Sequence, residues 1–306
     1  MNGILCIGLN PTVDISCTAE SVGPIHKVRT WNEKYDPGGG AINVARVIDV
    51  LGGEPVLAYL SGGTTGLMLE TLLKNYGFAQ HCFKMGGPVR VAYMVHEEST
   101  GLEYRFVPEG PEIRFEELQP LMNFVENFDG DYYVASGSLP SGVPSDSYAR
   151  IADLTQKKGA RFVLDTSGEA LHEAFAQGGI YLAKPSKHEL ELYAGHELDE
   201  AGLREVATAL VAKGVVENLV VSLGSDGALL AHADGVVQLP SPAVKARSAV
   251  GAGDSFVGAM TWGLFQGRPV AEAFRFGLAA GAAAVMTPGT DLCRHDDVHM
   301  LFGKLE

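Results

Sequence analysis

The sequence predicts an α/β protein, a three-layer α/β/α sandwich with a mostly parallel sheet and a small antiparallel β lid. Three observations lead to this fold class. Short apolar runs alternate with helical periods, which is the pattern of β-α units. Two pairs of strand-like segments have no helix between them, and the C-terminal part of the chain contains two long Ala-rich helical periods.

Six short runs rich in Val, Ile, Leu or Tyr are the expected strands of the main sheet. Parallel strands are covered on both faces, so they read as continuous apolar runs rather than as alternating ones. These runs occupy residues 4–9, 56–60, 132–135, 162–164, 180–183 and 219–221.

The expected helices between these strands have apolar residues at three- and four-residue spacing. They cover residues 41–51, 67–76, 115–125, 147–158 and 203–211. The Ala-rich helices at 254–265 and 271–286 are suited to cover a face of the sheet.

Residues 12–17 with 28–35, and 89–96 with 102–107, are predicted to pair as strands without crossover helices. We expect them to form the lid of one domain that spans residues 1–306. A small sheet exposes its edges and an apolar face, so burial against a partner chain is physically reasonable.

Composition limits the classes of partner and site. The net charge is −14 and Lys and Arg form no cluster, which argues against nucleic acid and anionic membranes as partners. The cysteines lack C-x-x-C spacing and indicate reduced, cytoplasmic thiols rather than a zinc site or disulfides. The first strand begins almost at the N-terminus and no long apolar run is present, so we expect no signal peptide or membrane span.

The run Ser-Ala-Val-Gly-Ala-Gly-Asp-Ser at 248–255 is the most informative segment. Its small residues Gly251, Ala252 and Gly253 let backbone N–H groups point outward at a helix N-terminus, where the helix dipole favours an anion. Asp254 beside that anion is poorly suited to bind phosphate but well suited to take a proton from an attacking hydroxyl. A purely structural glycine turn is the alternative interpretation.

Four segments, in this order, carry a resemblance to a known family: Asp-Pro-Gly-Gly-Gly-Ala-Ile-Asn-Val-Ala-Arg at 36–46, Ser-Gly-Ser-Leu-Pro at 136–140, Ser-Leu-Gly-Ser-Asp-Gly at 222–227, and the 251–254 run. The set resembles the PfkB (ribokinase-like) family of carbohydrate kinases, and within it the 6-phosphofructokinase branch. The resemblance extends from residue 4 to about residue 297. It implies an ATP- and Mg²⁺-dependent sugar-phosphate kinase that forms a homodimer through its lid, with a K⁺ requirement left open.

On the sugar side, Gly38 and Gly39 precede a helix, so a ligand can approach the backbone there, although a structural turn explains them almost as well. Asn43 offers both a donor and an acceptor to a sugar hydroxyl. Asp14 follows the first strand, at the sheet edge where ligands gather in open α/β folds. The resemblance places a sugar-binding Asp at the matching position.

Few cations are available to hold a phosphorylated sugar, since the chain has 37 acidic and 23 basic residues. Lys27, Arg90 and Arg105 lie in or next to lid segments, and the planar fork of an arginine suits phosphate. Each taken singly is equally a solvated surface charge. By resemblance all three bind the sugar phosphate, together with Ser138.

On the nucleotide side, the family pattern Asn-x-x-Glu is matched by Glu189 but not by Ser186. By resemblance Glu189 orders Mg²⁺ through its waters, whereas a plain charged residue in a first helical turn is the alternative. The loss of an asparagine at 186 puts metal affinity or the phosphate water network in doubt. The resemblance completes the ATP site with Lys184, Ser222, Gly224, Gly227 and Ser248.

Two further expectations concern loops and substrate. Ala249 replaces a frequent Thr, and the turn 288–290 is expected to close the adenine pocket or to form a monovalent-cation loop. Gly40 and Ala41 stand where the 1-phosphofructokinase and tagatose-6-phosphate kinase relatives typically have Lys-Gly, which favours fructose 6-phosphate as acceptor. Those two kinases, and a non-catalytic sugar-phosphate sensor on the same fold, remain the alternatives.

Overall fold

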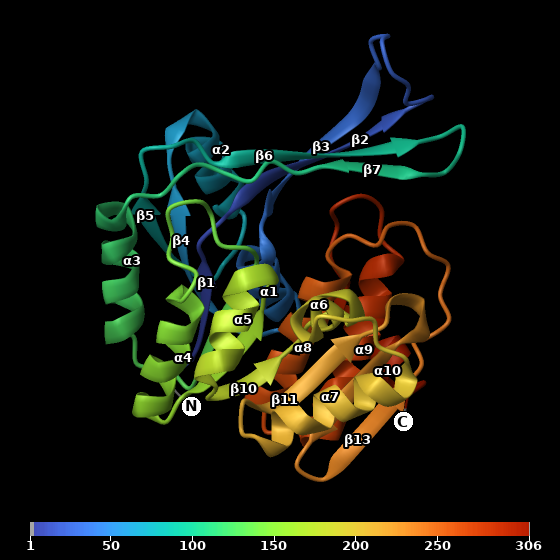
Figure 1. Ribbon diagram of the computed structural model, residues 1–306. Helices are drawn as coiled ribbons and strands as arrows, with labels where there is room; N and C mark the ends of the chain where they lie inside the picture. Colours follow the sequence, from blue (N-terminus) through green and yellow to red (C-terminus); the bar gives the residue numbers. More distant parts are fainter. Residues whose placement is uncertain (1–2, 306) are drawn as a thin grey trace.

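The computed structural model describes residues 3–305, and within them the strands form one sheet of nine strands and one of four (Figure 1). The larger sheet has the order β13-β12-β11-β10-β9-β8-β1-β4-β5. Its strands are β1 (Ile4–Gly8), β4 (Val56–Ser61), β5 (Ala79–Lys84), β8 (Tyr132–Ser136), β9 (Arg161–Asp165), β10 (Ile180–Ala183), β11 (Val216–Ser222), β12 (Ala228–His232) and β13 (Gly235–Leu239). The pairings from β5 to β11 are parallel, and β12 and β13 add antiparallel strands at one edge, so the predicted mostly parallel sheet is confirmed.

Helices cover both faces of this sheet. In Figure 1, α3 (Phe115–Asn127), α4 (Ser147–Lys158), α5 (Gly168–Gln177) and α7 (Glu200–Ala212) lie in front of it. On the other side α1 (Gly40–Val50), α8 (Ala252–Phe265), α9 (Val270–Val285) and α10 (His295–Phe302) pack side by side. The predicted three-layer sandwich is therefore confirmed. Among the described residues, no helix combines the length and apolar character needed to cross a membrane.

The close packing of α1 against α8 positions the site. A Cβ added at Gly258 of α8 would lie 2.8 Å from the side chain of Val47 on α1. Any larger residue would therefore push the two helices apart. Because α1 carries Asn43 and α8 carries Asp254, this glycine sets how near those two side chains come.

The smaller sheet lies across the top of the larger one in Figure 1 and has the order β3-β2-β6-β7. Its strands are β2 (Thr12–Ala19), β3 (Thr30–Gly38), β6 (Arg90–Glu97) and β7 (Glu103–Phe106). The pairs β2–β3 and β6–β7 are antiparallel as predicted, but β2 and β6 are parallel. Strand β2 follows β1 in the chain, and β6 follows β5. Because β1 and β5 are parallel strands of the main sheet, β2 and β6 enter the lid in the same direction.

Several elements were not predicted, and each is short or polar. Strand β5 is a half-exposed edge strand, whose sequence Ala-Gln-His-Cys-Phe-Lys has no continuous apolar run. Helices α6 (Lys187–Ala194) and α10 span eight residues each, too few for a clear apolar period. Helix α5 and strand β13 were also missed. The one-domain interpretation of 1–306 stays a prediction, and residues 1, 2 and 306 lie outside the described part of the chain.

Candidate active site

The N-terminus of α8 lies between two pockets formed by the described residues. The first, a cavity of about 170 Å³ beneath the lid, is lined on this side by Val250, Gly251 and Asp254. The second, of about 620 Å³, is lined by Ala249, Ala252 and Gly253. The turn begins with Gly251 in the left-handed region at φ 71°, which favours glycine. Residues of the predicted 251–254 run therefore line both pockets.

Asp254 occupies the first turn of α8 at the floor of the first pocket. Its Oδ2 accepts a hydrogen bond from Asn43 Nδ2 at 2.9 Å. Burial, reinforced by the negative charge of Asp165, raises the pKa of Asp254 to about 6, while Asn43 and Lys184 oppose the shift. A carboxylate with this pKa is ionised at neutral pH and is well matched to a general base.

The glycine turn at the start of α1 lines the first pocket with Gly39 and Gly40. Gly39, at φ 101°, caps the helix and lines the cavity. A Cβ at Gly38 would lie 2.0 Å from Asp14 Oδ2, so this position has room only for glycine. Asp14 of β2 lines the same pocket, and burial raises its pKa to about 6 against the opposing effects of Thr12 and nearby arginines. The structure therefore brings these predicted sugar-side residues together with Asn43.

Of the three predicted cations, the described lining of the first pocket includes Arg90 and Arg105 but not Lys27. Arg90 is held by the backbone, because its two terminal nitrogens donate to the carbonyls of Pro108 and Asn10 at 3.0 Å each. Arg105 on β7 is exposed, and Lys27 lies in the exposed loop between β2 and β3. The two arginines thus lie with Asp14 on the face of the lid sheet that lines the first pocket, while Lys27 is absent from the described lining.

Ser138 also lies outside the described lining of the first pocket. It belongs to a neighbouring hollow, where Asn10 Nδ2 donates to Ser138 Oγ at 3.2 Å. The carbonyl of the same Asn10 accepts from Arg90. Ser138 is therefore linked to the sugar side through Asn10, and its predicted direct contact with substrate stays a prediction.

The second pocket combines a polar end with apolar walls. Lys184, Ser222, Gly224 and Gly227 line it, as predicted. A Cβ at Gly227 would lie 2.0 Å from the carbonyl oxygen of Leu239, so the loop requires glycine there. The apolar walls come from Pro242, Val244, Phe256, Leu278 and Val285. Such a pocket suits a flat heteroaromatic ring in its apolar part and anionic groups near Lys184 and the N-terminus of α8.

Lys184 is paired with a carboxylate that sequence analysis missed. Its Nζ lies 3.1 Å from Asp165 Oδ1, and both side chains are largely buried. Burial raises the pKa of Asp165 against the effect of Lys184. Burial alone would lower the pKa of Lys184, yet the carboxylates of Asp165, Glu189 and Asp254 raise it overall. The Lys184 ammonium therefore stays charged. Asp165 could have been identified from the sequence, because it comes just after the predicted strand 162–164.

Ser186 and Glu189 form a capping box at the start of α6. Ser186 donates to Glu189 Oε2 through its backbone N–H at 2.7 Å and its hydroxyl at 2.9 Å, and Ser186 Oγ accepts from the Glu189 N–H at 3.2 Å. This satisfies orphan donors of the helix N-terminus. Among the described residues no group of three or more His, Cys, Asp or Glu side chains is arranged to hold a metal on its own. A hard cation such as Mg²⁺ would therefore also need phosphate oxygens and water as ligands. Glu189 is the residue predicted to order those waters.

Comparison with known proteins decides the family. The profile described as "pfkB family carbohydrate kinase" matches residues 1–297. The chain belongs to the pfkB family of carbohydrate kinases. The resemblance inferred from the ordered glycine-rich segments is thereby confirmed.

Relatives within the pfkB family match nearly the whole chain. The ATP-dependent 6-phosphofructokinase isozyme 2 of Mycobacterium tuberculosis is 39% identical over 302 residues, covering 98% of this chain and 88% of that protein. The Escherichia coli K12 protein of the same name is 38% identical over 304 residues, covering 99% and 98%. The structure of E. coli phosphofructokinase-2 in complex with fructose-6-phosphate has a TM-score of 0.94 at 36% identity and covers 100% of this chain and 99% of that one. Other structures of that protein contain potassium, or are described as a tetrameric inhibited form.

Ser248, predicted on the nucleotide side of this pfkB kinase, lies against the lid. Its hydroxyl donates to Glu103 Oε2 of β7 at 3.1 Å and accepts from the Val250 N–H at 3.2 Å. Among the described residues that line the second pocket, Ser248 is absent. Its contact with ATP stays a prediction, while its described contacts join the lid to the turn before Gly251.

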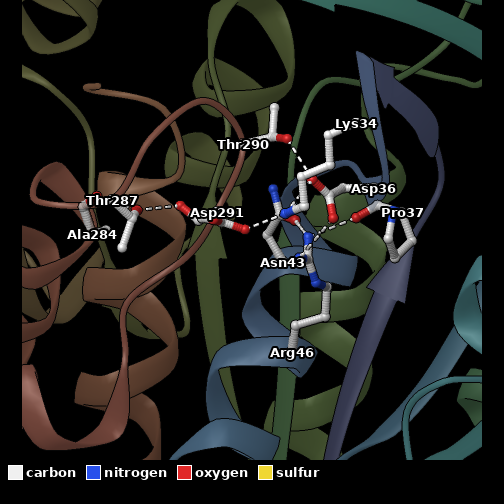
Figure 2. Close-up of polar contacts among 9 residues, drawn as sticks. All are labelled: Lys34, Asp36, Pro37, Asn43, Arg46, Ala284, Thr287, Thr290 and Asp291. Atoms are coloured by element: carbon white, nitrogen blue, oxygen red, sulfur yellow. Dashed lines mark hydrogen bonds and ion pairs between the residues drawn. The ribbon is translucent and has the colours of Figure 1, made fainter. Parts of the chain in front are cut away.

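The turn 288–290 also packs against the lid strands. Thr290 lines the first pocket and donates to Asp36 Oδ2 at 2.6 Å (Figure 2). A Cβ at Gly289 would lie 2.9 Å from Ser16 of β2. Among the described residues that line the second pocket, none comes from this turn, which packs on the lid strand β2 instead. Its role in closing the adenine pocket, and the alternative of a monovalent-cation loop, both stay predictions.

Proposed function

We propose that this chain is an ATP-dependent 6-phosphofructokinase, which transfers the γ-phosphoryl group of ATP to the 1-hydroxyl of fructose 6-phosphate. The observation that carries the proposal is the position of Asp254, between a polar pocket with two arginines and a larger pocket with apolar walls and a charged lysine. The names of the full-length relatives support the same activity.

In this mechanism the sugar hydroxyl lies in the first pocket beside Asp254. The carboxylate takes the hydroxyl proton while the oxygen attacks the γ-phosphorus in line, and the bond to the departing ADP oxygen breaks. Backbone N–H groups of Ala252, Gly253 and Asp254 at the helix N-terminus stabilise the charge on the moving phosphoryl. Mg²⁺, when bound, neutralises phosphate charge, and Glu189 is the residue proposed to order its waters.

The acceptor follows from where a phosphate can be held. Arg90 and Arg105 line the first pocket from the lid strands β6 and β7, so we place the 6-phosphate on the lid side and the reacting hydroxyl at Asp254. The lysine typical of the 1-phosphofructokinase relatives would replace Gly40, where a Cβ would lie 2.3 Å from Ser136 Oγ. This chain therefore lacks both that cation and the room for it.

The test is kcat/KM for fructose 6-phosphate, fructose 1-phosphate and tagatose 6-phosphate at saturating ATP. We expect the highest value for fructose 6-phosphate, with modest discrimination against tagatose 6-phosphate, which differs in the configuration of one hydroxyl. A higher value with fructose 1-phosphate would replace this assignment by 1-phosphofructokinase. ADP release that does not depend on any sugar, or no release at all, would favour the non-catalytic sensor.

We further propose a homodimer through the lid. Three aromatic residues lie in one row across the lid sheet: Tyr35, Tyr93 and Phe106. Ile15 of β2 pairs in register with Tyr35 on one side and with Tyr93 on the other, and Tyr93 pairs with Phe106. They are 43%, 48% and 55% exposed, and the row lies on the face opposite Asp14, since side chains alternate along a strand. A partner lid would bury this row. Light scattering should give twice the chain mass, and a Tyr93→Glu variant should shift it toward the monomer.

Lys27 fits this arrangement because it lies in the exposed loop beside Ile25, which is 97% exposed. It has no place in the described lining of its own first pocket, so its predicted contact with the sugar phosphate requires the partner lid.

We also propose that the protein is located in the cytoplasm, in accord with four cysteines that are all described and all free. A role for K⁺ is tested by the rate in K⁺ against Na⁺ buffers.

A further inference from the structure

Arg46 on α1 is a buried arginine whose contacts lead toward Asp254. It is 5% exposed, and its NH1 donates to Asn43 Oδ1 at 3.0 Å and to the carbonyl of Pro37 at 2.8 Å (Figure 2). Among the described residues that line the two pockets, Arg46 is absent. It therefore contacts neither ligand site directly, and any effect it has on Asp254 passes through Asn43.

The chemistry of the guanidinium fixes which way the Asn43 amide points. An arginine carries only donors, so the Asn43 oxygen must face Arg46. The amide nitrogen then faces Asp254 Oδ2, to which it donates at 2.9 Å. A flipped amide would set donor against donor at Arg46 and acceptor against acceptor at Asp254, so the arginine enforces a single orientation.

The charge of Arg46 is itself compensated. Its NH2 lies 3.8 Å from Asp36 Oδ1, and its guanidinium lies over the ring of Tyr76. Asp36 is held in turn by Thr290 Oγ1 at 2.6 Å and by Lys34 Nζ at 3.0 Å (Figure 2). The lid strand β3 and the turn 288–290 therefore meet at the carboxylate that anchors Arg46.

We propose that Arg46 is a positioning residue that, through the Asn43 amide, orients the Asp254 carboxylate and occupies one of its oxygens, leaving the other to take the hydroxyl proton. The inference rests on the proposed role of Asp254 as general base. A hydrogen bond donated to a carboxylate favours its ionised form. Losing that bond must therefore raise the pKa of Asp254 and move the acidic limb of the pH profile upward.

Other charged groups face these residues and stay in place when Arg46 is changed. Asp254 faces Asp165 at the end of β9, Lys184 after β10 and Asp14 of β2. The charge of Arg46 also acts on Asp14, as do those of Arg90 and Arg105. The experiment must therefore separate a path through Asn43 from a direct effect of the arginine charge.

A double-mutant cycle makes that separation. The variants are Arg46→Met, Asn43→Leu, which is nearly isosteric and cannot hydrogen-bond, and the two combined. We expect each single variant to move the acidic limb of kcat, measured at saturating sugar phosphate, upward by about one pH unit, which corresponds to one lost hydrogen bond, and the double variant to move it no further. Shifts that add in the double variant, or an unmoved limb in Arg46→Met, would overturn the proposal.

Three additional variants guard against a merely structural effect. Arg268→Met removes another partly buried arginine with a carboxylate partner, Glu272 at 2.6 Å, and aromatic contacts, and should leave the pH profile unchanged. Arg46→Lys keeps a donor and a charge and should move the limb less than Arg46→Met. If Arg46→Met folds poorly because Asp36 is left unpaired, the combination Asp36→Asn with Arg46→Met removes both partners and carries the same expectation.

A readout without turnover keeps this inference apart from the proposed function. In the full chain labelled with [¹³C]aspartate, the Asp254 carboxyl signal is identified by its loss in Asp254→Asn and titrated by NMR. An upward shift of its pKa in Arg46→Met and in Asn43→Leu supports the positioning role even if the chain transfers no phosphoryl group. An Asp254 pKa that is the same in wild type and Arg46→Met overturns it, whatever the activity.

Discussion

Asn43 donates a hydrogen bond to Asp254 over 2.9 Å, and this contact joins α1 to α8 across 211 positions of the sequence. The amide of the 36–46 segment therefore contacts the carboxylate of the 251–254 run. This pair and the lid arginines Arg90 and Arg105 all line the first pocket. The site therefore depends on the distance between two helices and on the position of the lid.

Replacing Asp254 by Asn should remove the proton acceptor and leave the shape of the site. We expect kcat to fall by roughly 10²–10⁴, the usual contribution of a positioned base. ATP binding, measured by calorimetry, should be nearly unchanged because the backbone donors of the helix N-terminus remain. Asp153→Asn, which alters an exposed carboxylate on α4, is the matched control. Wild-type turnover in purified Asp254→Asn would remove Asp254 from the mechanism.

The rate should depend on pH through the same carboxylate. Asp254 acts as a base only when ionised, and its pKa is raised to about 6. At saturating sugar phosphate, kcat should therefore be constant near neutral pH and fall as the pH drops through about 6. Asp14 also has a pKa raised to about 6, so kcat/KM should fall more steeply than kcat. A kcat that stays constant down to pH 5 would contradict the assignment.

The raised pKa of Asp254 should also affect the stability of the chain. Because the pKa of Asp254 is higher in the folded chain than the ordinary value of 3.8, its ionised form opposes folding at neutral pH. That cost shrinks as the pH falls below about 6, disappears only below the ordinary value of 3.8, and is absent when Asn replaces Asp254. The Asp254→Asn variant should therefore have a higher Tm than wild type at pH 7, and the difference should shrink toward pH 5.

Arg90→Ala and Arg105→Ala should chiefly weaken the sugar phosphate. A lost charge-assisted hydrogen bond to phosphate costs about 1.5–3 kcal/mol, so KM for the sugar phosphate should rise about tenfold or more. KM for ATP should change little because neither arginine lines the described second pocket. Arg204→Ala removes a surface arginine paired with Glu200 and serves as control. Normal binding of the sugar phosphate by both variants would mean that the phosphate lies elsewhere.

Restoring the family's asparagine at 186 tests the metal side. Asn is as good an N-cap as Ser, so Ser186→Asn should preserve the start of α6 and the stability of the chain. Its longer amide should lower the Mg²⁺ concentration needed for half-maximal rate. Asp199→Asn, which changes the N-cap of α7, controls for a general effect of altered caps. An unchanged Mg²⁺ dependence would exclude position 186 from the metal network of this protein.

The sequence was most informative where backbone geometry and residue type coincide. Gly227 and Gly39 have positive φ values, and at Gly38 a Cβ would collide with Asp14, so their positions in the motifs are structural requirements that the sequence records directly. The apolar strand runs were predictable for a similar reason, because both faces of a parallel sheet are buried.

Long-range polar contacts could not be predicted in this way. Asp165 pairs with Lys184, and Thr290 with Asp36, through folding that brings distant segments together, and neither pair has a local sequence pattern. The contact of the Ser248 hydroxyl with Glu103 of the lid is of the same kind, since 145 positions of the sequence separate the two residues.

The spacing of α1 and α8 gives the last prediction. A Cβ at Gly258 would lie 2.8 Å from Val47 and 3.1 Å from the carbonyl oxygen of Val44, so Gly258→Ala must force the helices apart. Overpacking of this kind costs about 1–3 kcal/mol of stability, and it should lengthen the Asn43–Asp254 contact, so kcat should fall together with Tm. Gly77→Ala, where an added Cβ meets nothing within 4 Å, should change neither. Adding Val47→Ala to Gly258→Ala should recover part of both losses, because it trims the side chain that the new methyl group strikes. If Gly258→Ala lowers Tm but leaves kcat unchanged, the distance between α1 and α8 does not control the catalytic carboxylate.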